Sequence, residues 1–232
     1  MNVVITGASK GIGKAIAQVF AAEGNHLFLC SRNEKQLYDT IAYLQTSYPY
    51  CKVSGQIADM GVKDDIQRFG EWVLASGTPD IVINNAGKFT PGSIYEEADG
   101  IFEEMITVNL FSAYRLTRIL LPAMIQAKQG HIFNICSIAS LQAYANGGSY
   151  SISKFALLGF SKNLREELKP HGIKVTAVCP GATLSASWDG FDIDPKRIME
   201  AADIAKMVLA ASQLSSMAVV EDIILRPQLG DL

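Results

Sequence analysis

Tyr150 and Lys154 are the pair of residues in this sequence best suited to move a proton. They stand four positions apart at the start of a predicted helix, so the phenol and the ammonium share one helix face. A free tyrosine titrates at about pH 10, too high for an efficient general base, and a neighbouring cation lowers that pKa toward neutrality. The pair therefore suits proton transfer between a carbonyl and an alcohol. The same spacing also fits an amphipathic surface pair without a chemical role.

A glycine-rich segment joins the first predicted strand to the first predicted helix. Its sequence is Thr6-Gly7-Ala8-Ser9-Lys10-Gly11-Ile12-Gly13. Glycines allow a tight turn and a close approach of the backbone to a ligand, and a helix N-terminus favours a pyrophosphate. The glycine spacing differs from the usual G-x-G-x-x-G. The position between strand and helix nevertheless predicts a dinucleotide site rather than a plain turn.

The end of the second predicted strand indicates which dinucleotide would bind. A fold that binds NAD usually places an acidic residue there, whereas one that binds NADP places an arginine near the 2′-phosphate. Here Ser31 and Arg32 occupy that corner, and no carboxylate follows until Glu34. Arg32 can pair with a phosphate through its planar guanidinium, and Lys10 adds a second cation. The corner favours NADP(H), although Arg32 also fits an ordinary solvated position before a helix.

Short β-branched runs alternate with longer segments of helical periodicity along the chain. The predicted strands are Val3–Ile5, His26–Cys30, Val53–Ile57, Asp80–Asn84, His131–Cys136, Lys174–Cys179 and Val219–Leu225. The predicted helical segments are Ile12–Ala22, Glu34–Tyr48, Val62–Ala75, Gly100–Lys128, Ser149–Leu168 and Ala202–Gln213. Most of the strands are apolar throughout, so helices must cover both faces. This predicts an α/β fold, a Rossmann-type doubly wound seven-stranded parallel sheet, with residues 1–232 as a single domain.

Charge and hydropathy exclude several classes of partner. The chain has 20 Lys+Arg and 23 Asp+Glu, a formal net charge of −3, and 49% hydrophobic residues, enough for a sizeable core. The longest basic run is Lys196-Arg197, so neither nucleic acid nor an anionic membrane is expected as a partner. The N-terminus lacks the pattern of a secretory signal, and no apolar window has the length of a membrane span. We expect a soluble, cytoplasmic protein.

The cysteines and histidines predict no metal site. Cys30, Cys51, Cys136 and Cys179 lie far apart without a Cys-x-x-Cys pair, and the three histidines are equally scattered. The cysteines are expected to be small buried hydrophobic residues kept in the reduced state.

Six motifs, in order along the whole chain, resemble those of the short-chain dehydrogenases/reductases in their single-domain form. They are Thr6 to Gly13, Asn84-Asn85-Ala86-Gly87, Val108-Asn109, Ser137, Tyr150 with Lys154, and Pro180-Gly181. The resemblance implies that Tyr150 donates the proton in reduction and that Lys154 tunes it and binds the nicotinamide ribose. It implies that Ser137 polarises the carbonyl and that Asn109 holds a water relay. Two hydroxyl donors and a cation would together stabilise the developing alkoxide.

The resemblance also implies the cofactor-binding residues. Asp59 is similar to the family's adenine contact, Asn85 and Ala86 would lie against the adenosine, and Thr183 to Ser185 would meet the carboxamide and phosphates. The full expected set is Gly7, Ser9, Lys10, Gly11, Ile12, Gly13, Ser31, Arg32, Asp59, Asn85, Ala86, Gly87, Val108, Tyr150, Lys154, Pro180, Gly181, Thr183 and Ser185. Loop capping by Asp, Asn, Thr and Ser is the ordinary alternative for the last-named positions.

A substrate loop is expected at about residues 183–201, which is short for this family. Within it, Trp188 and Phe191 would either close over an apolar substrate or pack the loop against the core. The helical segments 100–128 and 149–168 correspond to the family's usual dimer-forming pair, so a homodimer or homotetramer is expected. Their apolar faces would equally suit packing on the protein's own sheet.

The leading hypothesis is an NADP(H)-dependent oxidoreductase that interconverts a ketone or aldehyde with an alcohol, with reduction favoured. The resemblance extends to 3-oxoacyl-carrier-protein reductases and to pterin or small-carbonyl reductases, and analogy of fold does not choose among these small-molecule substrates. One alternative is an NADP(H)-binding module that senses redox state without turnover. Another is an NAD-linked alcohol dehydrogenase.

Overall fold

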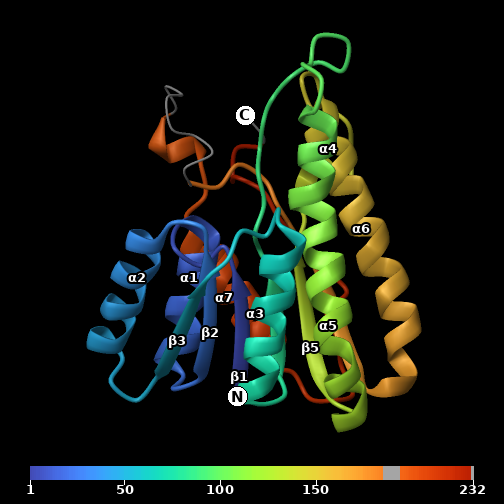
Figure 1. The fold of residues 1–232 in the computed structure, drawn as a ribbon. Coiled ribbons are helices and arrows are strands. Elements are labelled where there is room, and N and C mark those ends of the chain that lie inside the picture. The colour runs from blue at the N-terminus through green and yellow to red at the C-terminus, as the bar shows by residue number, and fades with distance from the viewer. Residues whose placement is uncertain (185–193, 231–232) are drawn as a thin grey trace.

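The computed structural model describes residues 1–184 and 194–230. It contains one sheet of seven strands in the order β3-β2-β1-β4-β5-β6-β7, and each pair of neighbouring strands runs parallel (Figure 1). The strands are β1 (Asn2–Thr6), β2 (His26–Ser31), β3 (Lys52–Ile57), β4 (Ile81–Asn84), β5 (Gly130–Ile135), β6 (Ile173–Pro180) and β7 (Asp222–Leu225). The α-helices of the described residues are α1 (Gly11–Ala22), α2 (Glu34–Ser47), α3 (Lys63–Ser76), α4 (Ile101–Ile106), α5 (Ser112–Ala127), α6 (Gly148–Leu168) and α7 (Ala201–Ser212).

Helices cover both faces of the sheet because its strands are apolar on both sides. Val3 and Ile5 of β1 point to one face, where they pack with residues of α1, α2 and α7. Val4 between them points to the other face, where it packs with residues of α3, α5 and α6. Successive side chains of a strand alternate between faces, so a continuous apolar run fills two cores. The predicted fold class is confirmed.

Two predicted elements differ from the structure by more than a shift of one residue at an end. The helical segment 100–128 is divided into α4 and α5 by a π-helical turn, Thr107–Phe111, which turns the buried side chain of Asn109 toward the backbone of Lys88. The last strand begins at Asp222 rather than Val219. The carbonyl oxygen of Val220 accepts a hydrogen bond from the Thr176 hydroxyl instead of taking part in the ladder.

A crevice is expected where the strand order reverses, between β1 and β4. The chain leaves β1 toward the face covered by α1, and the segment after β4 leads to α5 on the other face (Figure 1). The two connections therefore diverge at the carboxyl ends of the strands, which is where such sheets bind ligands.

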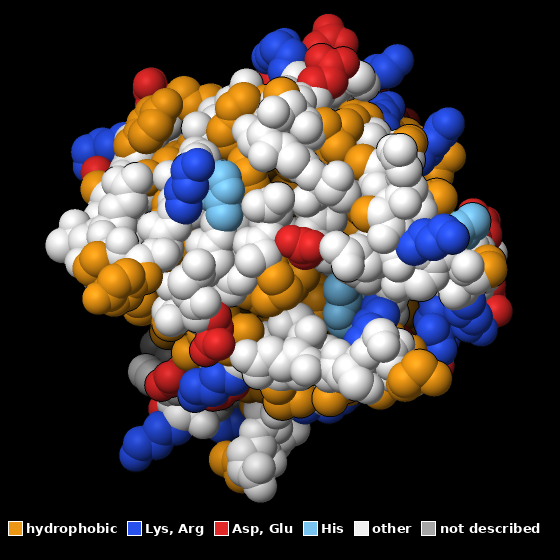
Figure 2. All heavy atoms as spheres, turned by 90° about the horizontal axis from the view of Figure 1, so that it is seen from below, with side chains coloured by type: hydrophobic (Ala, Val, Ile, Leu, Met, Phe, Trp, Pro, Cys, Tyr) orange, Lys and Arg blue, Asp and Glu red, His pale blue; other side chains and the backbone are white. Residues whose placement is uncertain are grey.

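Figure 2 shows the opposite, amino-terminal edge, where Lys and Arg side chains stand among Asp, Glu and uncharged surface. In the described part of the chain, no helix combines the length and apolar character needed to cross a membrane.

Candidate active site

A cavity of about 580 Å³ lies at the carboxyl edge of the sheet and collects most of the expected site residues. Those that line it are Gly7, Ser9, Lys10, Gly11, Ile12, Ser31, Arg32, Asp59, Asn85, Ala86, Gly87, Val108, Ser137, Tyr150, Lys154, Pro180, Gly181 and Thr183. Gly13 and Asn109 are not among the lining residues. Ser185, Trp188 and Phe191 lie outside the described residues.

The glycine turn has a backbone that only glycine tolerates well. Gly7 and Gly11 have φ angles of 64° and 55°, in the left-handed region. Gly13 has an ordinary φ, but a Cβ at this position would overlap the carbonyl oxygen of Gly7 and the side-chain amide of Asn85. Gly13 thus does not face the cavity, but its lack of a side chain lets the first turn of α1 pack directly against Gly7 and Asn85.

The segment after β4 braces the glycine turn. The side-chain nitrogen of Asn85 donates to the carbonyl oxygens of Thr6 (2.9 Å) and Gly7 (3.1 Å). In return, the Thr6 hydroxyl oxygen accepts hydrogen bonds from the backbone N–H groups of Asn85 (3.0 Å) and Ala86 (2.9 Å). The amide of Asn85 therefore holds the turn in shape, a role that the family resemblance alone did not indicate.

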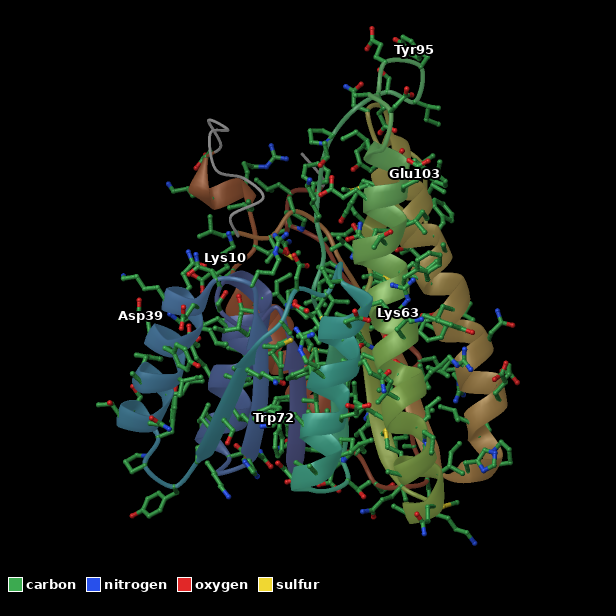
Figure 3. All side chains as sticks on the ribbon, viewed as in Figure 1. Lys10, Asp39, Lys63, Trp72, Tyr95 and Glu103 are labelled. Carbon is green, nitrogen blue, oxygen red and sulfur yellow. The ribbon has the colours of Figure 1, made fainter. Side chains whose placement is uncertain are left out.

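The N-terminus of α1 faces the cavity without an anion of its own. Its N-cap residue, Lys10, provides no side-chain cap, and the first turn of this fully described helix has no acidic residue. Lys10 lies at the same edge of the sheet (Figure 3). The hydroxyl oxygens of Ser9 and Ser31 are 2.8 Å apart and form a polar corner beside it. Free backbone N–H groups, the helix dipole and a lysine together favour a phosphate group.

Arg32 stands at the mouth of this half of the cavity. Its guanidinium nitrogen is 3.9 Å from a carboxylate oxygen of Asp59, and 65% of the Arg32 side chain is exposed. Exposed ion pairs contribute about 0 to 1 kcal/mol, so a phosphate could take over this guanidinium at little cost. The Asp59 carboxylate also accepts a hydrogen bond from the N–H of Gly61 at 2.8 Å, which fixes its orientation.

Tyr150, Ser137 and Lys154 meet in the other half of the cavity. The Ser137 hydroxyl accepts from the N–H of Ala139 at 3.1 Å and is hydrogen-bonded to the Tyr150 phenol. The Lys154 ammonium is buried, lies 5.8 Å from the centre of the Tyr150 ring and donates to the carbonyl oxygen of Ile135 at 2.8 Å. Two hydroxyl groups and one cation thus line one wall.

The expected lowering of the Tyr150 pKa is wrong for the protein without cofactor. Burial raises the pKa of Tyr150 to about 12, and the hydrogen bond from Ser137 offsets this only in part. Lys154 does not reverse the shift because its ammonium points to the Ile135 carbonyl, and burial also lowers the pKa of Lys154. At neutral pH the phenol therefore carries its proton, as a proton donor must.

A family model described as short chain dehydrogenase matches residues 1–194. The chain belongs to the short-chain dehydrogenase family. The expected family and the expected class of oxidoreductase enzyme are confirmed.

Three relatives of this short-chain dehydrogenase illustrate the range of the family. The chain is 39% identical over 181 residues to a granaticin polyketide synthase putative ketoacyl reductase of Streptomyces violaceoruber, and the match covers 77% of this chain and 66% of the relative. It is 32% identical to the sepiapterin reductase of Chlorobaculum tepidum, covering 99% of this chain and 97% of the relative. A metagenomic short-chain oxidoreductase solved in complex with NADP is 31% identical, with a TM-score of 0.86 over 98% of this chain and 97% of that one.

Asn109 of this short-chain dehydrogenase is buried behind the cavity wall. Its side-chain oxygen accepts from the N–H of Lys88 at 2.7 Å, and its nitrogen donates to the carbonyl oxygen of Lys88 (3.0 Å) and the hydroxyl of Ser153 (2.9 Å). Ser153 in turn donates to the carbonyl oxygen of Tyr150 at 2.6 Å. In the described contacts Asn109 thus ties the segment after β4 to the helix that carries Tyr150.

Sequence reasoning missed several residues that line the cavity, among them one phenylalanine, one glutamine and one tyrosine. Phe89, Gln142 and Tyr144 come from two loops, and the rings of Phe89 and Tyr150 meet edge to face with their centres 4.8 Å apart. Phe89 follows the Asn-Asn-Ala-Gly motif by two positions, which was the one available signal. Gln142 and Tyr144 had none, because their position depends on the path of an irregular segment.

All four cysteines are buried and unpaired by disulfides. Cys136 directly precedes Ser137, and its thiol is in contact with that of Cys179 on the neighbouring strand. The hydrogen bond from Cys179 lowers the pKa of Cys136, and the ammonium of Lys154 acts in the same direction. Within the described residues, no cluster of three or more His, Cys, Asp or Glu residues could hold a metal ion.

Proposed function

We propose that this chain is an NADP(H)-dependent oxidoreductase that reduces a ketone or aldehyde to the alcohol, with Tyr150 as the proton donor. The observation that carries the proposal is the wall of Ser137, Tyr150 and Lys154 in one cavity with the glycine turn and the uncapped start of α1. One half of the cavity suits the phosphates of a dinucleotide, and the other suits a carbonyl oxygen.

The residues present fit the cofactor. Gly7 and Gly11 give the turn its left-handed backbone, and a Cβ at Gly13 would overlap the carbonyl oxygen of Gly7 and displace that turn. Lys10 and Arg32 would hold the phosphates, Arg32 taking the 2′-phosphate that distinguishes NADP from NAD. The NADP complex of the metagenomic relative supports this choice. When bound, NADPH supplies the hydride that reduces the carbonyl carbon.

The chain's own groups control the oxygen end of the reaction. The hydroxyls of Ser137 and Tyr150 donate to the carbonyl oxygen and stabilise the negative charge that develops on it. Tyr150 then transfers its proton to that oxygen, which completes the alcohol. A pKa of about 12 keeps the phenol protonated beforehand. The ammonium of Lys154, 5.8 Å from the ring centre, would stabilise the phenolate left behind once it turned from the Ile135 carbonyl toward the phenol.

The assembly is proposed to be a homodimer or homotetramer. Exposed apolar side chains lie along α4, the π turn and α6, among them Phe102, Phe111 and Phe155. They are contributed by the two helical segments that the sequence predicts as the interface. Light scattering on the eluting protein during size-exclusion chromatography tests this, and a monomer at micromolar concentration would reject it.

The first experiment measures initial rates of NADPH and NADH oxidation against four carbonyl probes, with Tyr150→Phe in parallel. The probes are an acetoacetyl thioester, diacetyl, benzaldehyde and a pterin ketone. We expect turnover with NADPH and a loss of roughly 100- to 10,000-fold in kcat in Tyr150→Phe, the range of general acid catalysis. The affinity for NADPH, measured by fluorescence titration, should change less than threefold.

Other outcomes point elsewhere. Full turnover in Tyr150→Phe would remove Tyr150 from the mechanism. Preference for NADH would favour an NAD-linked dehydrogenase. Tight NADPH binding with no turnover of any probe would favour a redox-sensing module.

A further inference from the structure

The loop formed by residues 88–100 runs from the cavity to α4 and passes over the start of α6 (Figure 1). Tyr95 marks the tip of this loop, above the N-terminal ends of α4 and α6 (Figure 3). At its beginning, Lys88 and Phe89 line the cavity, and Phe89 presses edge to face against Tyr150. The loop therefore reaches the proposed proton donor directly.

The helix that carries Tyr150 takes its N-terminal cap from this loop. The N-cap residue of α6 is Gly147, which has no side chain to cap with. Instead, the carboxylate of Glu97 accepts a hydrogen bond from the backbone N–H of Ser149 at 2.9 Å, and a second, short one from the Ser149 hydroxyl. A carboxylate at this position satisfies a free N–H group and is favoured by the helix dipole.

A glycine permits this close approach. Gly148 has a φ of 39°, and a Cβ on it would overlap the Glu97 carboxylate and the carbonyl oxygen of Gly92. The backbone N–H of Gly92 also donates to the carbonyl oxygen of Asn146 at 3.0 Å. The loop is thus hydrogen-bonded at Asn146 and at Ser149 to the segment before the proposed proton donor. Gly148, between them, has a positive φ and no Cβ, which leaves room for the Glu97 carboxylate.

The contacts of Glu97 and Phe89 fall on two consecutive residues at the start of α6. Glu97 holds Ser149, the neighbour of Tyr150 in sequence, and Phe89 touches the ring of Tyr150 itself. We propose that Glu97 is a positioning residue, which fixes the 88–100 loop on α6 and so sets the position of Phe89 against the phenol of Tyr150. A carbonyl bound between Ser137 and Tyr150 would then be oriented by Phe89. The inference rests on the proposed function, because it concerns the same tyrosine.

The preceding residue offers a matched control. Glu96 has the same charge and stands in the same loop, but it is exposed, and among the described contacts its carboxylate accepts a hydrogen bond only from Ser93. Glu96→Gln therefore removes the same charge without touching α6. Its kinetics should match those of the unmodified chain within twofold.

The test compares Glu97→Ala and Glu97→Gln with Glu96→Gln, using NADPH and the carbonyl probe that the chain reduces fastest. We expect kcat to fall about 5- to 10-fold in Glu97→Ala, no more than in Phe89→Leu, because Phe89 no longer orients the phenol. Glu97→Gln should lie between, since its amide oxygen still accepts one hydrogen bond. KM should change less than threefold and the affinity for NADPH less than twofold. A kcat within twofold of the unmodified chain in Glu97→Ala would overturn the proposal.

A double-mutant cycle with Phe89→Leu separates positioning from simple support of the helix. If Glu97 acts through Phe89, Glu97→Ala should lower kcat less than threefold in the Phe89→Leu background. Effects that multiply in full would overturn the proposal, as would a fall in kcat that thermal denaturation traces to unfolded protein. Tyr150→Phe distinguishes failure of the proposed function from failure of the positioning role of Glu97. If Tyr150→Phe retains turnover, the proposed function fails, whereas loss of turnover there with a neutral Glu97→Ala rejects the positioning role alone.

Discussion

The cofactor half of the cavity is shaped by backbone and glycine, whereas the substrate half is shaped by side chains that meet from distant segments. In the first, Gly7 and Gly13 are separated by a few positions, and one amide, that of Asn85, braces them. In the second, Phe89 comes from the loop after β4, whereas Tyr144 and Tyr150 come from the end of a much later loop and the start of α6. A turn that excludes Cβ atoms admits one residue type, but a wall of side chains admits many.

This difference determines how much each half tolerates change. The first prediction is that Gly13→Ala lowers the affinity for NADPH by roughly 100-fold or more, because the added Cβ overlaps the Gly7 carbonyl and displaces the phosphate turn. Fluorescence titration with NADPH measures this. Gly159→Ala is the matched control, since a Cβ there meets no atom within 4 Å, and it should bind NADPH normally. An affinity for NADPH within threefold in Gly13→Ala would show that the turn is not tightly shaped.

Arg32 tests a part of the cofactor half that depends on a charged side chain. Arg32→Asp should reduce kcat/KM with NADPH by about 10- to 100-fold, since a charge-assisted pair with the 2′-phosphate is worth about 1.5 to 3 kcal/mol. The rate with NADH should stay the same or rise. Lys35→Asp, three positions away on the exposed surface of α2, is the control for charge alone. An equal loss with both cofactors would mean that Arg32 does not read the 2′-phosphate.

The same contrast explains what the sequence could predict. The glycine turn, the Tyr150 and Lys154 pair and the seven strands follow local rules of spacing, so they were predictable. The π turn at Asn109 was not, because it depends on a contact with Lys88 from another segment. Nor was the direction of the Tyr150 pKa, since helical spacing places Lys154 nearby but does not reveal that its ammonium binds the Ile135 carbonyl.

Phe89 tests the tolerance of the substrate half. Phe89→Leu should change kcat/KM for the carbonyl probes by about 2- to 10-fold, the range expected for loss of an edge-to-face aromatic pair. The affinity for NADPH should stay within twofold, because Phe89 is not part of the glycine turn. Gains for some probes and losses for others would fit a wall that selects substrates. If Phe89→Leu weakened NADPH binding tenfold, the division of the cavity into two halves would have to be abandoned.

The last prediction concerns the sheet that carries both halves of the cavity. His131 lies in β5, where its Nε2 is 2.7 Å from the hydroxyl oxygen of Thr176, and burial lowers its pKa from 6.5 to about 3. Between these values the unfolded chain binds one proton more than the folded chain, so stability falls as the pH is lowered, by about 1.4 kcal/mol per pH unit.

Because the Thr176 hydroxyl donates to Val220, it accepts from His131, and the amide of His131→Gln can donate in the same place without titrating. Urea denaturation at pH 7, 6, 5 and 4 should show stability falling with a slope shallower by about one proton in this variant, while kcat/KM at pH 7 stays within twofold. Equal slopes would mean that another buried group accounts for acid sensitivity. A shallower slope would show that protonation of His131 destabilises the sheet in acid. The Tyr150 phenol, with its pKa of about 12, keeps its proton over the same range.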